Sequence, residues 1–250
     1  MKSKFKNSIH VGTSGWNYDH WQGPFYPQDV EKPKWLEFYQ DRFSSVEINN
    51  SFYQLPDKKT FTDWKNKVSE DFIFSVKAGR YITHMKKLKQ PKEALHNFTD
   101  NVISLEEKLG PLLFQLPPNW KRNPERLKNF LKLCPDDLWY TFEFRDPDWW
   151  HDEIYHILEE HNAAFCIFEL SGTTSPIEIT SDIVYIRLHG PGDAYEGKYK
   201  DKTLESWAEK IEKWVDQGKV VFLYFDNDQN GYAAQNALKI RELFKPDKDR

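Results

Sequence analysis

Apolar residues follow two different spacings, and the two spacings alternate along the chain. Short runs rich in β-branched and aromatic residues predict buried strands, whereas apolar positions that recur every three or four residues predict helices with one buried face. Strands are predicted at residues 9–12, 45–49, 72–77, 111–116, 138–144, 163–168, 183–188 and 220–225. Helices are predicted at residues 33–43, 60–70, 92–109, 124–133, 153–161, 203–217 and 233–244.

Eight strands separated mostly by helices predict one (β/α)8 barrel, a TIM-like α/β fold that forms a single domain over residues 1–250. A doubly wound open sheet is the structural alternative. The barrel is favoured because several strands place a polar residue inside an apolar run, which a barrel interior allows near its mouth. Residues 169–181 contain Gly172 and Pro176 and show no helical spacing. The connection between the sixth and seventh strands is therefore expected to lack a regular helix.

Composition and charge narrow the class of protein. Hydrophobic residues make up 39% and charged residues 30%, as in ordinary globular proteins, and the net charge of −4 argues against a nucleic-acid partner. The two cysteines form no CxxC pair, which argues against a structural zinc and suits a reducing compartment. The apolar runs are too short to span a membrane, and no apolar segment follows the basic amino terminus. A cytoplasmic location without a membrane partner is expected.

The stretch after the last predicted strand begins like a calcium loop. Asp226, Asp228 and Asn230 alternate, and Gly231 occupies the sixth position, but Ala237 stands where an EF-hand needs a bidentate glutamate. The stretch also follows a strand rather than a helix, so it is interpreted as a strand-to-helix turn. Asp226 is expected to face a pocket or to pair with an arginine. Asp228 and Asn230 are expected to shape the turn and to cap the helix.

Polar residues gather where the predicted strands end, which is the edge where TIM barrels form their active sites. Glu47, Lys77, Glu143 and Arg187 each interrupt an apolar strand, where an unpaired charge is costly. They either pair as a buried ring or line a functional pocket, and both alternatives place them at one mouth of the barrel. The candidate catalytic residues are Glu47, Glu143, His189 and Asp226. The candidate substrate-binding residues are Trp16, Tyr18, Asn49, Tyr53, Lys77, Gln115, Arg145, Arg187 and Asn227.

A series of motifs along the chain resembles the signature of the domain-of-unknown-function 72 family. The motifs are VGTSGWNYDHWQGPFYP, FSSVEINNSFYQLP, FSVKAGRYITHMKKLK, GPLLFQLPPNW, FEFRDPDWW, YIRLHGP and the terminal YFDNDQNGYAAQNALKIREL. They cover nearly the whole chain in the order that the family has. The resemblance implies a TIM-like barrel and points to the same residues at the strand ends, but it implies no particular reaction.

The first functional hypothesis is an enzyme with hydrolase- or lyase-like acid–base chemistry on a small anionic substrate. The substrate would be phosphorylated or carboxylated and sugar- or nucleotide-like, and Lys77, Arg145 and Arg187 would hold its charge. Glu47 and Glu143 could form the carboxylate pair of a glycosidase. No cofactor is required. A divalent metal held by the four candidate catalytic residues is possible but not favoured, because the neighbouring cations compete for the carboxylates.

The alternative hypothesis is a non-catalytic protein that binds a small ligand or associates with nucleic acid. The basic segment at residues 84–92, HMKKLKQPK, could contact phosphates, but a solvated loop is the favoured interpretation. Aromatic residues of the first loop could stack on a ring of the ligand or form a lid. They are Trp16, Tyr18, Trp21, Phe25 and Tyr26.

Overall fold

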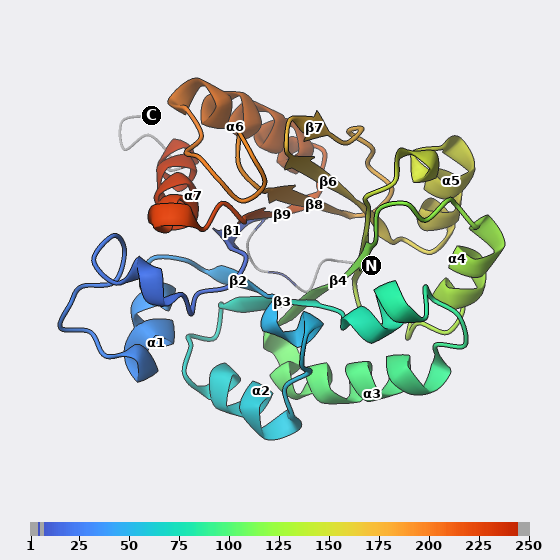
Figure 1. Cartoon of the computed structure of the whole chain (residues 1–250), viewed down its shortest axis with the longest axis horizontal. Helices are drawn as coiled ribbons and strands as arrows, with labels where there is room; N and C mark the ends of the chain where they lie inside the picture. The colour runs from blue at the N-terminus through green and yellow to red at the C-terminus, as the bar shows by residue number, and fades with distance from the viewer. Residues whose placement is uncertain (1–4, 6–7, 245–250) are drawn as a thin grey trace.

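A computed structural model describes residue 5 and residues 8–244. The predicted domain also includes residues 1–4, 6–7 and 245–250, and these lie outside the described residues, as does most of the basic amino terminus. Eight parallel strands surround a central axis, with the helices outside (Figure 1). The strands are β1 (Ile9–Thr13), β2 (Ser45–Ile48), β3 (Ile73–Lys77), β4 (Leu109–Leu116), β5 (Tyr140–Phe144), β6 (Ala164–Leu170), β8 (Ile183–Leu188) and β9 (Val220–Phe225).

Helices follow most of the strands, as the predicted alternation requires. They are α1 (Trp35–Gln40), α2 (Lys58–Asn66), α3 (Lys92–Val102), α4 (Pro124–Leu131), α5 (Asp152–Glu160), α6 (Asp201–Asp216) and α7 (Tyr232–Leu243). Within the described part of the chain, none of these helices has the length and apolar composition needed to cross a bilayer.

The connection from β6 to β8 contains no helix, which confirms the prediction for that segment. Ser171 and Gly172 adopt positive φ angles and turn the chain back, so that β7 (Thr173–Thr174) pairs with β6 in antiparallel orientation. The following segment is then fixed by side-chain hydrogen bonds. The Thr180 hydroxyl accepts from the Phe165 amide at 2.9 Å and donates to the Ala163 carbonyl at 2.7 Å. The two bonds thus give hydrogen-bond partners to the Phe165 amide and the Ala163 carbonyl, in a connection that contains no helix.

The strands form a nearly closed barrel in the order β1-β9-β8-β6-β5-β4-β3-β2. In the described part of the chain, an isolated bridge between Ser14 and Glu47 takes the place of a full ladder between β1 and β2. The Tyr39 hydroxyl spans the rest of this seam, because it accepts from the Thr13 amide at 2.9 Å and donates to the Ser45 carbonyl at 3.1 Å. The TIM-like fold class predicted from the sequence is confirmed.

The barrel interior is built in layers, because alternate residues of a strand point to the same face. The lower layer is apolar or aromatic and fully buried, with Leu113, Cys166, Tyr185, Phe222 and Tyr224 in one cluster. The residues two positions after Leu113, Cys166, Tyr185 and Tyr224 point to the same interior. They are Gln115, Phe168, Arg187 and Asp226. A larger apolar cluster fills the space between the sheet and the helices. This upper layer, which contains the charged residues Arg187 and Asp226, therefore lies between a packed barrel core and the mouth.

Several predicted boundaries were wrong. The helix predicted at 92–109 ends at Val102, and Ile103–Lys108 continue as 3-10 helix in which Glu106 adopts a φ of 53°. β4 begins at Leu109 rather than at residue 111, because Leu109 already pairs with Phe74 of β3. The helix predicted at 60–70 begins at residue 58, where the Asp57 carboxylate accepts from the Thr60 amide and caps it.

Gly12 is predicted to be required for closing the barrel. A Cβ atom at this position would lie 2.0 Å from the Ser45 carbonyl oxygen of β2, which is backbone and cannot move aside. Gly12→Ala should therefore lower the free energy of unfolding by at least ~2 kcal/mol, measured by urea denaturation. Gly192→Ala is the control, because a Cβ atom there meets nothing within 4 Å, and its effect should stay within ~0.5 kcal/mol. Equal stability of the two variants would contradict this role of Gly12.

Candidate functional site

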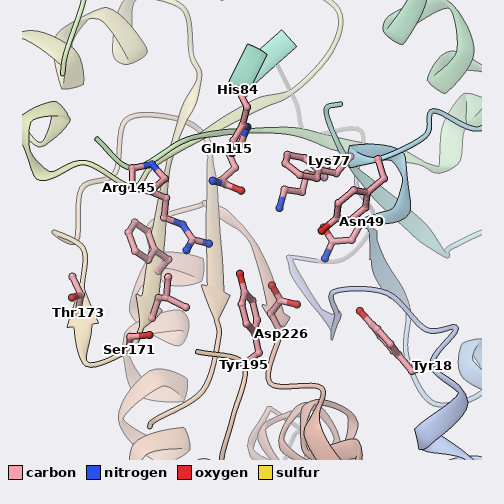
Figure 2. Close-up of a pocket in the computed structure, with 15 residues that line it drawn as sticks. Tyr18, Asn49, Lys77, His84, Gln115, Arg145, Ser171, Thr173, Tyr195 and Asp226 are labelled. Atoms are coloured by element: carbon pink, nitrogen blue, oxygen red, sulfur yellow. The ribbon is translucent and has the colours of Figure 1, made fainter. Parts of the chain in front are cut away.

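A pocket of about 610 Å³ opens at the carboxyl ends of the strands. Figure 2 shows Arg145 entering it from the side of Ser171 and Thr173, and Lys77 and Asn49 entering from the opposite side. Its lining residues are Tyr18, Asn49, Phe52, Tyr53, Lys77, His84, Gln115, Pro118, Arg145, Phe168, Leu170, Ser171, Thr173, Tyr195 and Asp226. The pocket thus combines cationic, carboxylate, amide and aromatic groups at the edge where the barrel fold places its ligands.

Arg187 lies beneath the pocket and is fully buried. Its guanidinium donates to Glu47 Oε1 at 2.9 Å, to Glu143 Oε2 at 2.8 Å and to Asp226 Oδ2 at 2.8 Å. These four residues, named here the Arg187 cluster, come from four different strands or strand ends. Burial by itself lowers the pKa of the guanidinium, but the carboxylates outweigh burial and keep the pKa well above its usual range. Arg187 is therefore permanently charged and neutralises buried carboxylates.

The Glu47 carboxylate uses its hydrogen-bonding capacity inside the protein. Oε1 accepts from the Ser14 hydroxyl at 2.7 Å, and Oε2 accepts from the Tyr185 hydroxyl at 2.6 Å. Both oxygens also accept from Arg187 Nε at 3.1 Å. Glu47 has no exposed surface and does not line the pocket. As the structure stands, this carboxylate positions Arg187 rather than facing a ligand.

Glu143 is held in the same way, between two arginines. Its Oε1 accepts from Arg145 Nε, and its Oε2 accepts from Arg187 Nη1. Burial raises the pKa of the Glu143 carboxyl, but the two guanidinium groups outweigh that effect and hold the pKa well below its usual range. Glu143 is thus an ionised, fully buried anion that fixes the direction in which Arg145 reaches the pocket.

The hydrogen bonds of His189 define its tautomer. Arg145 Nη2 and Arg187 Nη1 each lie 2.9 Å from Nε2, and because guanidinium nitrogens only donate, Nε2 must be the acceptor. Nδ1 then carries the proton and donates to the Glu169 carbonyl at 3.0 Å. Burial, reinforced by Arg187, lowers the pKa of the imidazole well below its usual range. His189 is therefore a neutral acceptor that orients both arginines.

Asp226 is the carboxylate of the Arg187 cluster that reaches the pocket. It lies at the end of β9, two residues after Tyr224, so the strand alternation turns it toward the interior. Burial raises the pKa of this carboxyl to about 7, against the lowering effect of Arg187. Near neutral pH the Asp226 carboxyl can hence gain or lose a proton, which suits acid–base chemistry.

Lys77 lines the pocket at the end of β3. Its ammonium lies 4.6 Å from the centre of the Phe52 ring, and no carboxylate among the described residues forms an ion pair with it. Burial, together with the charge of Arg187, lowers its pKa to about 8. Lys77 is thus a largely desolvated cation that faces open space.

The structure brings together most of the predicted site residues, but not all of them line the pocket. Tyr18, Asn49, Tyr53, Gln115 and Arg145 do so. Trp16 lies in a neighbouring hollow, while Glu47, Glu143, Arg187 and His189 lie beneath the floor. Asn227 turns away from the pocket, and its amide donates to the Gly197 carbonyl at 2.7 Å and to the Asn236 side chain at 3.0 Å.

Two expectations for the flanking loops were wrong. Trp21 and Tyr26 are fully buried and Phe25 packs against the apolar core, so these three aromatics of the first loop form no lid. Neither Asp228 nor Asn230 caps α7. Gly231 occupies the cap position without a side-chain bond, and Asn230 shapes the turn through its φ of 53°.

Eight of the lining residues were absent from the predicted site, and four of these eight carry an aromatic ring. Phe52 and His84 belong to short helices that follow β2 and β3, and Tyr195 belongs to a loop after β8. Phe168 lies inside β6, where its apolar run gives no sign of a pocket. His84 begins the basic segment noted in the sequence, which was the one available signal for any of them.

A metal centre finds no support in the described residues, where no three histidine, cysteine or acidic side chains are grouped so that they could hold an ion. The carboxylates of the Arg187 cluster are already bonded to guanidinium groups.

Comparisons with other proteins agree with the fold. The family model described as "Protein of unknown function DUF72" matches residues 10–250. The UPF0759 protein YunF of Bacillus subtilis (strain 168) is 26% identical over 273 residues, covering 94% of each chain. A crystal structure of a DUF72 family protein from Thermotoga maritima MSB8 matches with a TM-score of 0.85 at 28% identity, covering 95% of this chain and 99% of that one. None of these names specifies a reaction.

A DUF72 family protein from Enterococcus faecalis V583 supports the fold alone. Its crystal structure matches with a TM-score of 0.79 at 20% identity, covering 96% of this chain and 97% of that one.

Removing the buried guanidinium is predicted to destabilise the protein strongly. Arg187→Met would leave Glu47, Glu143 and Asp226 without their shared counter-charge, and breaking a buried ion pair costs ~3–5 kcal/mol. Urea denaturation should show a loss of at least this size, or a failure to fold. Lys128→Met removes an exposed ion pair with Glu160 and should change stability little. A stable, well-folded Arg187→Met variant would refute the stabilising role of the cluster.

Lys77 is predicted to give stability a distinct pH dependence. Its folded pKa of about 8 lies below the ordinary value of 10.5, so between these values the unfolded chain binds more protons than the folded one. The stability of the wild type relative to Lys77→Met should therefore rise with pH above about 8, and the full cost of burying the ammonium should be present below it. Urea denaturation between pH 7 and 9.5 measures the difference. If the difference in unfolding free energy between the wild type and Lys77→Met does not change with pH, the Lys77 ammonium is not buried and desolvated.

Proposed function

Because the chain belongs to the DUF72 family, as its motifs predicted, and the family description names no reaction, we propose a function from the pocket itself. The proposed function is acid–base catalysis on a small anionic substrate, phosphorylated or carboxylated, bound at the mouth of the barrel. The observation that carries it is the presence of Lys77, Arg145 and Asp226 on one pocket, with Lys77 lacking an ion-pair partner among the described residues.

Two cations are available to hold the anion. Arg145 uses Nε for Glu143 and Nη2 for His189, and within the described residues Nη1 makes no hydrogen bond. Lys77 contributes its ammonium from the other side of the pocket (Figure 2). When Asp226 is protonated, Lys77, Arg145 and Arg187 face only the two carboxylates Glu47 and Glu143. The site then carries an uncompensated positive charge, which an anionic substrate would neutralise.

Asp226 is the proposed acid–base residue. It is the lining carboxylate of the cluster, and its pKa of about 7 allows both protonation states at neutral pH. Glu47 and Glu143 would act on it indirectly, by holding Arg187 in place. His189, as a neutral acceptor, would orient Arg145 toward the substrate. This proposal assigns the chemistry to one carboxyl, that of Asp226, next to two anion-binding cations. It does not use Glu47 and Glu143 as the carboxylate pair of a glycosidase.

A second candidate function is binding without turnover. It is favoured by the complete engagement of Glu47 and Glu143 in ion pairs, which leaves few groups free for chemistry. Both candidates share the anion-binding pocket. They differ in whether a bound ligand is converted, which product analysis by mass spectrometry distinguishes.

The proposed pocket is tested by titrating small anions while following thermal unfolding. Inorganic phosphate, sugar phosphates, nucleoside monophosphates and small carboxylates form the panel. A ligand at about a hundred times its dissociation constant should stabilise the wild type by ~2.7 kcal/mol, a shift of several degrees. Lys77→Met should weaken binding at least about tenfold, because it removes one of the two available cations.

Asp226→Asn is predicted to change ligand binding and turnover more than Asp228→Asn. The Asp228 carboxylate lies 3.4 Å from His20 and does not line the pocket, which makes Asp228→Asn the matched control. Isothermal titration of both variants with the best ligand of the panel gives the comparison. Equal effects of the two substitutions would exclude Asp226 from the site, and the absence of any anion binding that depends on Lys77 would overturn the proposed function.

A further inference from the structure

A second hollow of about 430 Å³ adjoins the anion pocket. The two share Tyr18, Asn49 and Tyr53 as a common wall. Figure 2 shows Asn49 and Tyr18 on the side of the pocket away from Arg145, so the second hollow opens from that side. Tyr53 is 77% exposed. A molecule bound in the anion pocket could therefore extend past this wall without displacing buried structure.

The second hollow has a chemistry different from that of the first. Trp16 and Trp64 form its aromatic side, with ring centres 5.1 Å apart and planes at 88°. Leu36 and Pro33 add apolar surface. Among the described residues, no carboxylate or histidine lines it, and its charged groups are Lys32, which is already paired with Asp19, and Lys67. Aromatic and apolar surface of this kind receives a flat ring.

Asn49 supplies an independent sign of a ligand at the junction. Its side-chain oxygen is buried and accepts no hydrogen bond from any described residue. A buried acceptor without a donor is costly, so such groups are usually matched by a ligand or a water. A hydroxyl or N–H group on a ligand that passes between the two hollows would match it.

We propose that the natural ligand is bipartite, with an anionic head held at Lys77 and Arg145 and a flat aromatic or apolar ring seated against Trp16 and Trp64. This inference rests on the proposed anion pocket and adds the class of its substrate. The hydrogen-bond donor that Asn49 requires lies between the two parts. Ring contacts and burial of apolar area add to the affinity, and the head determines the orientation of the ligand.

Two matched pairs of chemical probes test the proposal in calorimetric titrations. The pairs are inorganic phosphate with phenyl phosphate, and acetate with phenylacetate. In at least one pair the ring-bearing member should bind about tenfold more tightly to the wild type. Trp64→Leu should abolish this gain while the affinity for the bare anion stays unchanged, which also shows that the variant is folded. Lys77→Met should weaken both members of the pair.

Two further variants make the test independent of the folding of Trp64→Leu. Tyr53→Ala alters the exposed part of the common wall and should reduce the gain from the ring at least threefold. Tyr81→Ala removes another exposed aromatic that lines neither hollow, and it should leave the gain intact. A gain that survives both Trp64→Leu and Tyr53→Ala would overturn the placement of the ring.

The remaining outcomes separate this inference from the function on which it rests. If the bare anions bind through Lys77 and the ring adds nothing, the bipartite ligand is refuted and the anion pocket stands. If no anion binds in a manner that depends on Lys77, the proposed function itself fails.

Discussion

The ion pairs of one buried arginine determine the form of this barrel mouth. Arg187 has no exposed surface and bonds three carboxylates that come from β2, β5 and the end of β9. Each carboxylate would be too costly to bury alone, and the guanidinium would be too costly to bury without them. The cluster therefore holds distant strands at fixed separations and also fixes the electrostatics above it. Glu143 extends the same network to Arg145, and from there to the pocket.

The network divides the polar residues into two levels. Below the floor, Glu47, Glu143 and His189 are engaged in hydrogen bonds. The two guanidinium groups hold the pKa of Glu143 well below its usual range, and burial together with Arg187 lowers the pKa of His189. At the floor and walls, Asp226 and Lys77 are desolvated without being saturated, so their pKa values move toward neutrality. Groups of the second kind are the ones that can exchange protons or attract an ion. The lower level positions the upper level, and only the upper level meets the ligand.

Sequence patterns anticipated a large part of this arrangement. The alternation of strands and helices predicted the barrel. The charged residues that interrupt apolar strands, among them Glu47, Lys77 and Arg187, predicted where the mouth lies. The missing helix between β6 and β8 was also evident, because Gly172 and Pro176 leave no helical spacing there. Helix ends were less predictable. The end of α3 at Val102 depends on the pairing of Leu109 with β3, which is a tertiary contact.

By itself, then, the sequence determined the family, the barrel and many of the residues that gather at its mouth, because motifs and two-residue alternation are local properties of the chain. Only the tertiary structure decided which of those residues face the pocket. Glu47 and Arg187 are 140 positions apart, and whether a carboxylate pairs with a guanidinium or stays open to a ligand depends on distances across the barrel. The aromatics of the first loop show the same limit, since Tyr26 is buried by stacking on Trp35 of α1 and Trp21 donates to the distant Asp228 carbonyl.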